Sequence, residues 1–405
     1  MATHRLYYDN SYLQTFNARV LSCLPAAPVS TDSGTKPAWE VLLDRTAFYP
    51  SSGGQPNDLG RLGEARVLDV RDDGEDIVHI VDQEHSPGDV EGCLDWGRRF
   101  DHMQQHTGQH LLSAMFQERF GLPTVSFHLG SDLCTIDLRG PEPSADALRG
   151  GQRAANAIIF EDRTVNVRYG TADQLAREGV RKEVDREGIL RAIEIEAADL
   201  QPCGGTHVRT TGQIGLVLIR RCTKIRQDWR VEFACGGRAE SIASGDFGLL
   251  RAIGERLGCA QEEALLVIEK SSAERDASSK SLRTTLQQLA EARAKLLIAG
   301  AVPANDEVRI IAEVLREESP ELLLPLATEL AKTEKTVALL VHEPTGQLVF
   351  AQSRAAGKDL SAVLSQVLAT TFGKGGGTRD FVRAKLVDAS KSNAALELAK
   401  QFAVG

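Results

Sequence analysis

The chain has 405 residues, of which 42% are hydrophobic and 25% are charged, the balance of a globular protein with two or three domains. Its formal net charge of −9 excludes a global basic field, so any contact with nucleic acid has to come from local patches. The seven cysteines form no CxxC pair, the N-terminus lacks an apolar signal core, and no run of ~18 apolar residues could cross a membrane, so we expect a cytoplasmic protein without a membrane partner.

The first two predicted domains differ in secondary structure. Residues 1–95 contain short apolar runs separated by Gly, Pro, Asp and Ser, a pattern typical of a small β-barrel or sandwich. Residues 96–245 begin with a helix that ends at Gly121 and continue with strand-like runs and a second helix over 143–162. This order of elements predicts an α+β fold.

The second half of the chain is predicted as a helical segment, residues 246–300, followed by a compact α/β domain, residues 301–405. The helical segment carries four leucines with a spacing of four, three and seven residues: Leu282, Leu286, Leu289 and Leu296. Two interpretations stay open. The leucines can pack a single helix onto its own domain, or they can form a short coiled coil that, with the C-terminal domain, joins two chains into a homodimer.

Three histidines, His102, His106 and His110, lie four residues apart in the stretch DHMQQHTGQHLL. On a helix such residues share one face, so either neighbouring pair can converge on one metal ion. Downstream, QPCGGTHV places Cys203 four residues before His207, with two glycines between them that allow a tight turn. Histidines combined with one cysteine suit a tetrahedral Zn²⁺. The sequence therefore predicts one zinc ion per chain, and the spacing alone does not choose between the histidine pairs.

The residues between the histidines exclude several classes of zinc enzyme. Thr107 stands where HExxH proteases need a glutamate base, and Gln109 stands where the inverted HxxEH motif needs one. The zinc deaminase pattern is also absent, because only one cysteine follows Pro202.

Five motifs together resemble a known family. The motifs, in chain order, are DRTAFYPSSGGQPNDLG, QHTGQHLLSA, SFHLGSDLCTIDL, PCGGTHVRTTGQIG and FGKGGGTRDFVRAKL. The first four resemble the editing domain of alanyl-tRNA synthetases and its free-standing AlaX relatives. The last resembles the glycine-rich core of the DHH-associated domain at the C-terminus of the long AlaX proteins. The match is spread over nearly the whole chain, and the aminoacylation module of the synthetase has no counterpart in it.

The resemblance implies a fold and an activity. The fold would be an N-terminal barrel (1–95), a zinc-binding editing domain (96–245), a helical linker (246–300) and a DHH-associated domain (301–405). The activity would be trans-acting hydrolysis of mischarged alanine tRNA that carries serine, with glycine as a second candidate. The zinc ligands would be His106, His110, Cys203 and His207. The alternative is a non-catalytic tRNA-binding protein in which the zinc is structural.

Serine differs from alanine by one hydroxyl, and an apolar pocket separates such isosteres only about 100-fold. An editing site therefore needs polar groups that require the hydroxyl as a partner. The candidates are Thr107, Gln109 and His128, although the first two can merely complete a helix surface and the third can be a core histidine. The amides of Gly204 and Gly205 are candidate donors to the developing oxyanion, or they only form a tight turn.

The role of the zinc stays open at this stage. Four protein ligands close a tetrahedral site, which is the pattern of structural zinc. Either one ligand is displaced, or the ion becomes five-coordinate, or the ion only orders the pocket.

Two glycine-rich stretches are the candidate tRNA contacts. Gly53, Gly54 and Gln55 form a turn that the resemblance places beside the editing pocket, near the tRNA acceptor end; the alternative is a plain β-turn. In the C-terminal stretch, consecutive amides can cradle a phosphate and neighbouring cations add attraction, although three glycines can also mark the start of a helix. The residues of this stretch are Lys374, Gly375, Gly376, Gly377 and Arg379.

Overall fold

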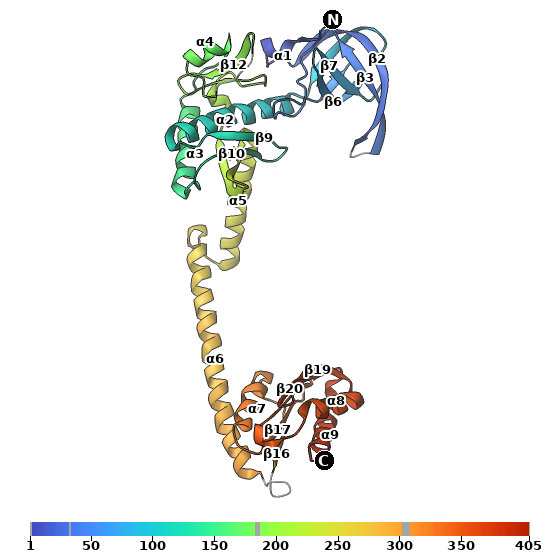
Figure 1. Cartoon of the computed structure of the whole chain (residues 1–405), viewed down its shortest axis with the longest axis vertical. Helices are drawn as coiled ribbons and strands as arrows, with labels where there is room; N and C mark the ends of the chain where they lie inside the picture. The colour runs from blue at the N-terminus through green and yellow to red at the C-terminus, as the bar shows by residue number, and fades with distance from the viewer. Residues whose placement is uncertain (1, 32–33, 183–186, 302–307, 405) are drawn as a thin grey trace. The chain divides into compact units, whose positions relative to one another are not determined.

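The computed structural model describes residues 2–404 except 32–33, 183–186 and 302–307 (Figure 1). The chain forms two compact units, Met1–Ala252 and Ile253–Gly405. Both units combine helices with β-sheets, which confirms the mixed α+β class. The four-part division of the chain stays a prediction.

Six strands of the first unit close into a barrel, in the order β2-β3-β7-β6-β5-β8 (Figure 1). Their bounds are β2 (Thr15–Thr31), β3 (Gly34–Leu43), β5 (Gly60–Leu62), β6 (Ala65–Asp73), β7 (Asp76–Val81) and β8 (Gly88–Leu94). Apolar side chains such as Val41, Leu62 and Ile77 are fully buried in its interior. Beside the barrel, a two-residue strand β1 (His4–Arg5) pairs with β4 (Arg45–Thr46), and the short helix α1 (Leu6–Asp9) follows β1.

A buried ion pair joins the barrel region to helix α2 (Trp96–Phe120). Nε of Arg99 donates to both carboxylate oxygens of Asp58 at 3.0 Å, and both side chains are fully buried. The guanidinium also donates to the carbonyl oxygens of Ser11 at 2.8 Å and Ala47 at 2.5 Å. Because a buried charge is costly without partners, these bonds fix the start of α2 against the segment that precedes β5.

Helix α2 has clear signals at both ends. The Asp95 side chain accepts a hydrogen bond from the amide of Arg98 at 3.1 Å, which caps the N-terminus. Gly121 ends the helix in a left-handed conformation with φ 64°, which glycine adopts without steric cost. The predicted helix end at Gly121 is confirmed.

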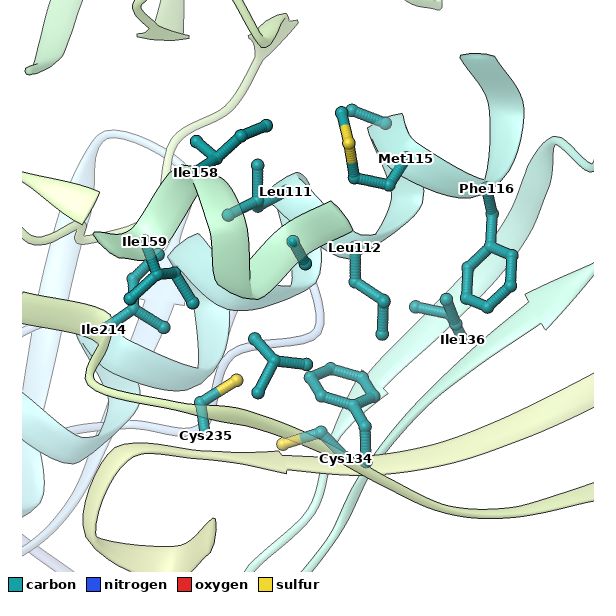
Figure 2. Close-up of a cluster of buried hydrophobic side chains, with 14 of the residues drawn as sticks. Leu111, Leu112, Met115, Phe116, Cys134, Ile136, Ile158, Ile159, Ile214 and Cys235 are labelled. Atoms are coloured by element: carbon teal, nitrogen blue, oxygen red, sulfur yellow. The ribbon is translucent and has the colours of Figure 1, made fainter. Parts of the chain in front are cut away.

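The main core of the first unit lies between α2 and a four-stranded antiparallel sheet. Leu111, Leu112, Met115 and Phe116 of α2 are buried in this core together with Ile136 of the sheet (Figure 2). The strand order is β14-β15-β10-β9, with β9 (Thr124–Leu129), β10 (Cys134–Leu138), β14 (Val217–Ile225) and β15 (Asp228–Cys235). This packing places the middle of α2, which carries the predicted histidine ligands, inside the protein.

The remaining elements of the first unit surround this core. Helix α3 (Ala145–Phe160) contributes Ile158 and Ile159 to it (Figure 2). A second antiparallel sheet has the order β11-β12-β13, with β11 (Val165–Gly170), β12 (Leu190–Ile195) and β13 (Asp199–Pro202), and α4 (Ala172–Arg177) follows β11. Helix α5 (Gly236–Leu257) begins before the predicted linker and contains the division between the two units.

The second unit is built on a five-stranded sheet of order β16-β17-β18-β20-β19. The strands are β16 (Arg309–Leu315), β17 (Thr336–His342), β18 (Gln347–Gln352), β19 (Gly373–Gly377) and β20 (Phe381–Leu386). The helices are α6 (Ala264–Gly300), α7 (Leu323–Ala331), α8 (Leu360–Thr371) and α9 (Ser392–Val404). No helix in the described ranges is long and apolar enough to cross a membrane.

The four leucines of the predicted linker differ in how far they are buried. Leu286 packs against the core that α6 shares with α7, whereas Leu282, Leu289 and Leu296 are 50%, 45% and 75% exposed. The helix therefore packs on its own unit through part of this series. The homodimer stays a prediction.

The C-terminal glycine stretch is neither a phosphate-binding loop nor the start of a helix, the two structures expected from the sequence. Gly373–Gly377 is the edge strand β19, paired antiparallel with β20. The amides of an extended strand point alternately to opposite sides, so Gly375, Gly376 and Gly377 do not form a concave phosphate cradle. They do not start a helix either, because the next element is a strand. The glycines allow close pairing, since a Cβ at Gly375 would lie 2.3 Å from Cβ of Ala384.

Candidate metal centre

Four side chains converge between α2 and the loop that follows β13: His106, His110, Cys203 and His207, here called the metal cluster. One donor atom from each residue lies within 4.8 Å of all the others. Sγ of Cys203 is 3.4 Å from Nε2 of His106 and 3.3 Å from Nε2 of His207. Two ligands of one tetrahedral zinc are separated by about 3.3–3.6 Å, given bonds of about 2.0–2.3 Å. The two distances from Cys203 match this range, and the cluster could hold a metal ion.

Each histidine of the metal cluster has its Nδ1 occupied by a different partner. Nδ1 of His106 bonds to Oε1 of Gln55 at 2.8 Å. Nδ1 of His110 lies 3.2 Å from Oδ2 of Asp199, and Nδ1 of His207 lies 3.1 Å from Oγ1 of Thr107. A partner on one ring nitrogen fixes the tautomer and leaves the other nitrogen for a metal. The three Nε2 atoms are therefore the donors that face the cluster.

Gln55 also ties the metal cluster to the loop after β13. Its Oε1 accepts from the amide of Thr206 at 3.1 Å, and its Nε2 donates to Oγ1 of Thr206 at 2.8 Å. The backbone of Gly205 lies close to the imidazole of His106. A Cβ added at Gly205 would lie 2.3 Å from Cε1 of His106. Only glycine fits there without displacing the imidazole. The CGGTH sequence is thus explained by packing against a histidine from the distant helix α2.

The charges of the metal cluster are coupled. Burial raises the pKa of the Cys203 thiol, but His106 and His207 outweigh this effect and lower the pKa well below its ordinary value. Burial opposes a charge on His110, yet its bonds to Asp199 and Cys203 raise its pKa to about 9. Burial, with a contribution from His106, lowers the pKa of His207 to about 3. The surroundings of Cys203 therefore favour the thiolate, the form that binds metals.

The metal cluster opens onto a cavity of about 740 Å³. His106, Gln109, His110 and Cys203 are among its lining residues. The rest of the lining comes from the barrel side, strand β9 and the loop after β13, and includes Arg5, Tyr8, Tyr49, Gly53, Gly54, Thr124, Phe127, Lys182 and Gly204. The cavity thus combines residues of the metal cluster with aromatic and cationic side chains.

The three candidate serine sensors occupy different positions. Thr107 is fully buried and its hydroxyl is already used, since it donates to the carbonyl oxygen of Met103 at 2.8 Å and accepts from the amide of Val208 at 3.2 Å. Gln109 lines the cavity, with an exposed fraction of 3%. His128 is exposed on β9 and is not part of the cavity lining. The structure thus brings only Gln109 of the three to the cavity.

The two candidate oxyanion donors also differ. Both Gly204 and Gly205 line the cavity. The amide of Gly205 donates to Sγ of Cys203 at 3.3 Å, so it already has an acceptor. His102, the third histidine of α2, is 3% exposed and lies outside both the metal cluster and the cavity lining. The structure therefore selects the pair His106 and His110.

The candidate tRNA residues fall into two groups. Gly53 and Gly54 line the cavity with left-handed φ angles of 55° and 82°, whereas the side chain of Gln55 is 2% exposed and faces the metal cluster. Lys374 is exposed on β19 in the second unit. Arg379 follows β19 and donates to the carbonyl oxygen of Gly357 at 3.0 Å.

Sequence reasoning missed several residues of the site. Asp199 has no motif around it and lies on β13, a strand that was not predicted. Ser113 and Thr124, which bond to each other at 2.8 Å next to Gln109, look like ordinary helix and strand residues in the sequence. The one available signal was in the motif SSGGQPNDLG, whose Gln55 and Asp58 turn out to hold His106 and Arg99.

Comparisons with known proteins show which family the chain resembles. The family model described as the threonyl and alanyl tRNA synthetase second additional domain matches residues 190–232, which include Cys203 and His207. The alanyl-tRNA editing protein Aarsd1 of Rattus norvegicus is 30% identical over 393 residues, which is 94% of each chain. The chain belongs to the family of alanyl-tRNA editing proteins.

Two further relatives show how much of the chain the similarity covers. The alanyl-tRNA editing protein AlaX-L of Pyrococcus horikoshii is 29% identical over 399 residues, again 94% of each chain. The alanine–tRNA ligase of Pyrococcus abyssi is 30% identical over 416 residues, which cover 98% of this chain and 43% of the ligase. The resemblance to editing proteins that the sequence motifs indicated is therefore confirmed.

Proposed function

We propose that this chain is a trans-editing hydrolase that deacylates mischarged alanine tRNA and holds one zinc ion in the metal cluster. Seryl-tRNA is the main substrate of the proposal and glycyl-tRNA the second. The observation that carries it is the convergence of three histidines and the sulfur of Cys203 beside a cavity of about 740 Å³. The names of the relatives, alanyl-tRNA editing proteins, support the substrate class.

The chemistry of the proposal is hydrolysis of an ester. A zinc ion in the metal cluster would supply Lewis-acid polarisation of the ester carbonyl or a more acidic bound water. Gln55, Thr107 and Asp199 hold the three imidazoles so that their Nε2 atoms stay directed at one point. The amide of Gly204 is the candidate donor to the oxyanion, since that of Gly205 already donates to Cys203.

The walls of the cavity suit the end of an RNA chain. The ring of Tyr8 lines the cavity and lies 5.3 Å below the guanidinium carbon of Arg191, and aromatic faces of this kind stack on unpaired bases. Lys182 adds a cation to the cavity lining, which would attract the phosphate backbone. Gly53 and Gly54 also line the cavity and leave room because they have no side chains. In the second unit, Lys374 and Arg379 are further proposed contacts to the tRNA.

The test is deacylation of three substrates by zinc-loaded protein. Purified chain is mixed with seryl-, glycyl- and alanyl-tRNA of alanine identity, and loss of the amino acid is followed. We expect rapid loss of serine, slower loss of glycine and retention of alanine. Cys203→Ala should lose bound zinc and activity together, whereas Cys93→Ala, which removes an exposed cysteine, should keep both. Binding of tRNA without hydrolysis of any ester would instead support a non-catalytic tRNA-binding protein with a structural zinc.

A further inference from the structure

The side-chain oxygen of Gln109 is a buried acceptor without a partner in the described part of the chain. The residue is 3% exposed and lines the cavity beside His106 and His110. A buried polar atom left without a hydrogen bond is unfavourable, and such atoms are rare in folded proteins. Because Gln109 lines the cavity, a molecule bound there could supply the missing donor.

A short hydrogen-bond network determines which end of the Gln109 carboxamide is left for the cavity. Nε2 of Gln109 donates to Oγ of Ser113 at 2.9 Å. Oγ1 of Thr124 donates to the same oxygen at 2.8 Å. Ser113 is fully buried one turn further along α2, while Thr124 begins β9 and lines the cavity. Because the amide nitrogen is engaged with Ser113, the free group is the oxygen Oε1.

We propose that Gln109 distinguishes seryl from alanyl esters, because its Oε1 accepts a hydrogen bond from the hydroxyl of the seryl group. Ser113 and Thr124 are positioning residues that hold the carboxamide in this orientation. The inference rests on the proposed function, since it names the group that reads the amino acid in the same cavity. It also replaces the other two sensor candidates, since the Thr107 hydroxyl is already bonded and His128 lies outside the cavity.

An alanyl ester lacks the hydroxyl that would bond to the Gln109 oxygen. Its methyl group offers no donor, so the Gln109 oxygen stays unpaired when alanine occupies the cavity. A site that bonds a substrate hydroxyl can reject the analogue without it by as much as about 10,000-fold, whereas an apolar pocket reaches only about 100-fold. The α-ammonium group is the other possible donor, but both esters carry it. A bond from the ammonium would therefore not separate serine from alanine.

The first test compares three esters on the same tRNA: seryl, alanyl and 2-aminobutyryl, the last being close to serine in size but without a hydroxyl. We expect Gln109→Met to lower the ratio of seryl to alanyl kcat/KM by about 10-fold or more. The loss should be confined to the seryl ester. The matched control is Gln117→Met, the same change on the same helix at a residue outside the cavity lining, which should keep the ratio. Equal losses on all three esters would overturn the inference, since they would indicate a bond to the shared ammonium.

The positioning role is tested by the hydroxyl that Thr124 contributes. Thr124→Val removes the bond to Ser113 and should lower the ratio of seryl to alanyl kcat/KM. Thr124→Ser keeps a hydroxyl and should restore the ratio. A merely structural role would lower the rates on all three esters together and would not be rescued by the hydroxyl, which would contradict the proposed network.

A binding measurement separates this inference from the proposed function. If the wild-type chain hydrolyses seryl-tRNA but Gln109→Met keeps its selectivity, the inference fails and the function stands. If the wild type hydrolyses none of the esters, the function fails, and calorimetry with amide-linked 3′-seryl and 3′-alanyl analogues of aminoadenosine decides the inference. Tighter binding of the seryl analogue, lost in Gln109→Met, supports it. Equal binding of the two analogues, or binding of neither, overturns it.

Discussion

Nδ1 of His110 lies 3.2 Å from a carboxylate oxygen of Asp199, and the other oxygen of Asp199 accepts from Nε of Arg181 at 2.7 Å. All three side chains are largely buried. The carboxylate therefore orients the imidazole from behind while the arginine orients the carboxylate. This relationship links β13 to the metal cluster through a residue that is not itself a ligand.

The first prediction is that Asp199→Asn weakens metal binding. Loss of the negative charge removes the electrostatic support of the imidazole, and changes of this kind cost about 10- to 100-fold in metal affinity. The measurement is a competition for zinc with a chromophoric chelator. The control is Asp137→Asn, which alters another Asp–Arg pair, with Arg230 at 2.8 Å, that touches no cluster residue. Equal zinc affinity of wild type and Asp199→Asn would show that Asp199 does not support the ligand.

The second prediction compares two neighbouring glycines. A Cβ at Gly205 would lie 2.4 Å from Nδ1 of His106 and 2.9 Å from Oε1 of Gln55, whereas a Cβ at Gly204 would come no closer than 3.5 Å, to the Tyr8 hydroxyl. Gly205→Ala should therefore displace the imidazole of His106 and lower the zinc content of the purified protein. Gly204→Ala should keep it. Full zinc content in Gly205→Ala would mean that the loop can shift without losing the ligand.

The four residues of the metal cluster could be found from the sequence because they stand in two compact motifs. The spacing of the histidines could not choose a pair, since on a helix His102 is related to His106 as His106 is to His110. The choice depends on which face of α2 meets the loop after β13, and this is a property of tertiary packing. His102 is also buried, but it lies outside the metal cluster. Burial lowers the pKa of its imidazole to about 4.

The residues that orient the histidines of the metal cluster could not be predicted from the sequence. Gln55 was assigned to a tRNA-facing turn because a turn motif shows where the backbone bends but not where a side chain points. Asp199 has no local signal at all, since its role exists only after β13 pairs with β12. The local structure of the β19 glycines could not be predicted for a related reason, because glycine permits both a concave loop and a closely paired edge strand.

The third prediction concerns the buried pair of Arg99 and Asp58. Arg99→Leu leaves a fully buried carboxylate without its counter-charge, which should lower the free energy of unfolding of the first unit by about 3 kcal/mol or more. Adding Asp58→Asn should recover part of the loss, because the remaining group is neutral. Urea unfolding followed by tryptophan fluorescence reports on this unit alone, since the chain's tryptophans, Trp39, Trp96 and Trp229, all lie in it.

The control for the Arg99–Asp58 pair is an ion pair that lies exposed on the protein surface. Arg149→Leu removes the ion pair with Asp146 on the surface of α3, where the side chains are 59% and 90% exposed, and exposed pairs of this kind contribute about 0.5 kcal/mol or less. If Arg99→Leu were as stable as Arg149→Leu, the buried pair would not be what fixes α2 against the barrel.

The fourth prediction is an acid sensitivity of the barrel that originates at His79. The ring is fully buried, and burial lowers its pKa from the ordinary 6.5 to about 4. Both nitrogens are engaged, since Nδ1 lies 3.2 Å from the carbonyl oxygen of Val41 and Nε2 lies 2.8 Å from the hydroxyl of Thr46. The carbonyl can only accept, so Nδ1 carries the hydrogen and Nε2 accepts from Thr46. A second proton would have to displace that bond.

The lowered pKa of His79 in the folded state determines how stability changes with pH. Between pH 6.5 and about 4 the unfolded chain binds a proton at His79 that the folded chain does not. Stability is therefore lost as the pH falls through 6.5, and the loss levels off below about 4. At pH 5 the contribution is about 2 kcal/mol. We expect His79→Gln to be less stable than wild type at pH 7.5 but to lose less stability on going to pH 5, with the exposed His128→Gln as the control. His102 titrates in both proteins and cancels in the comparison, so parallel losses in wild type and His79→Gln would contradict the assignment.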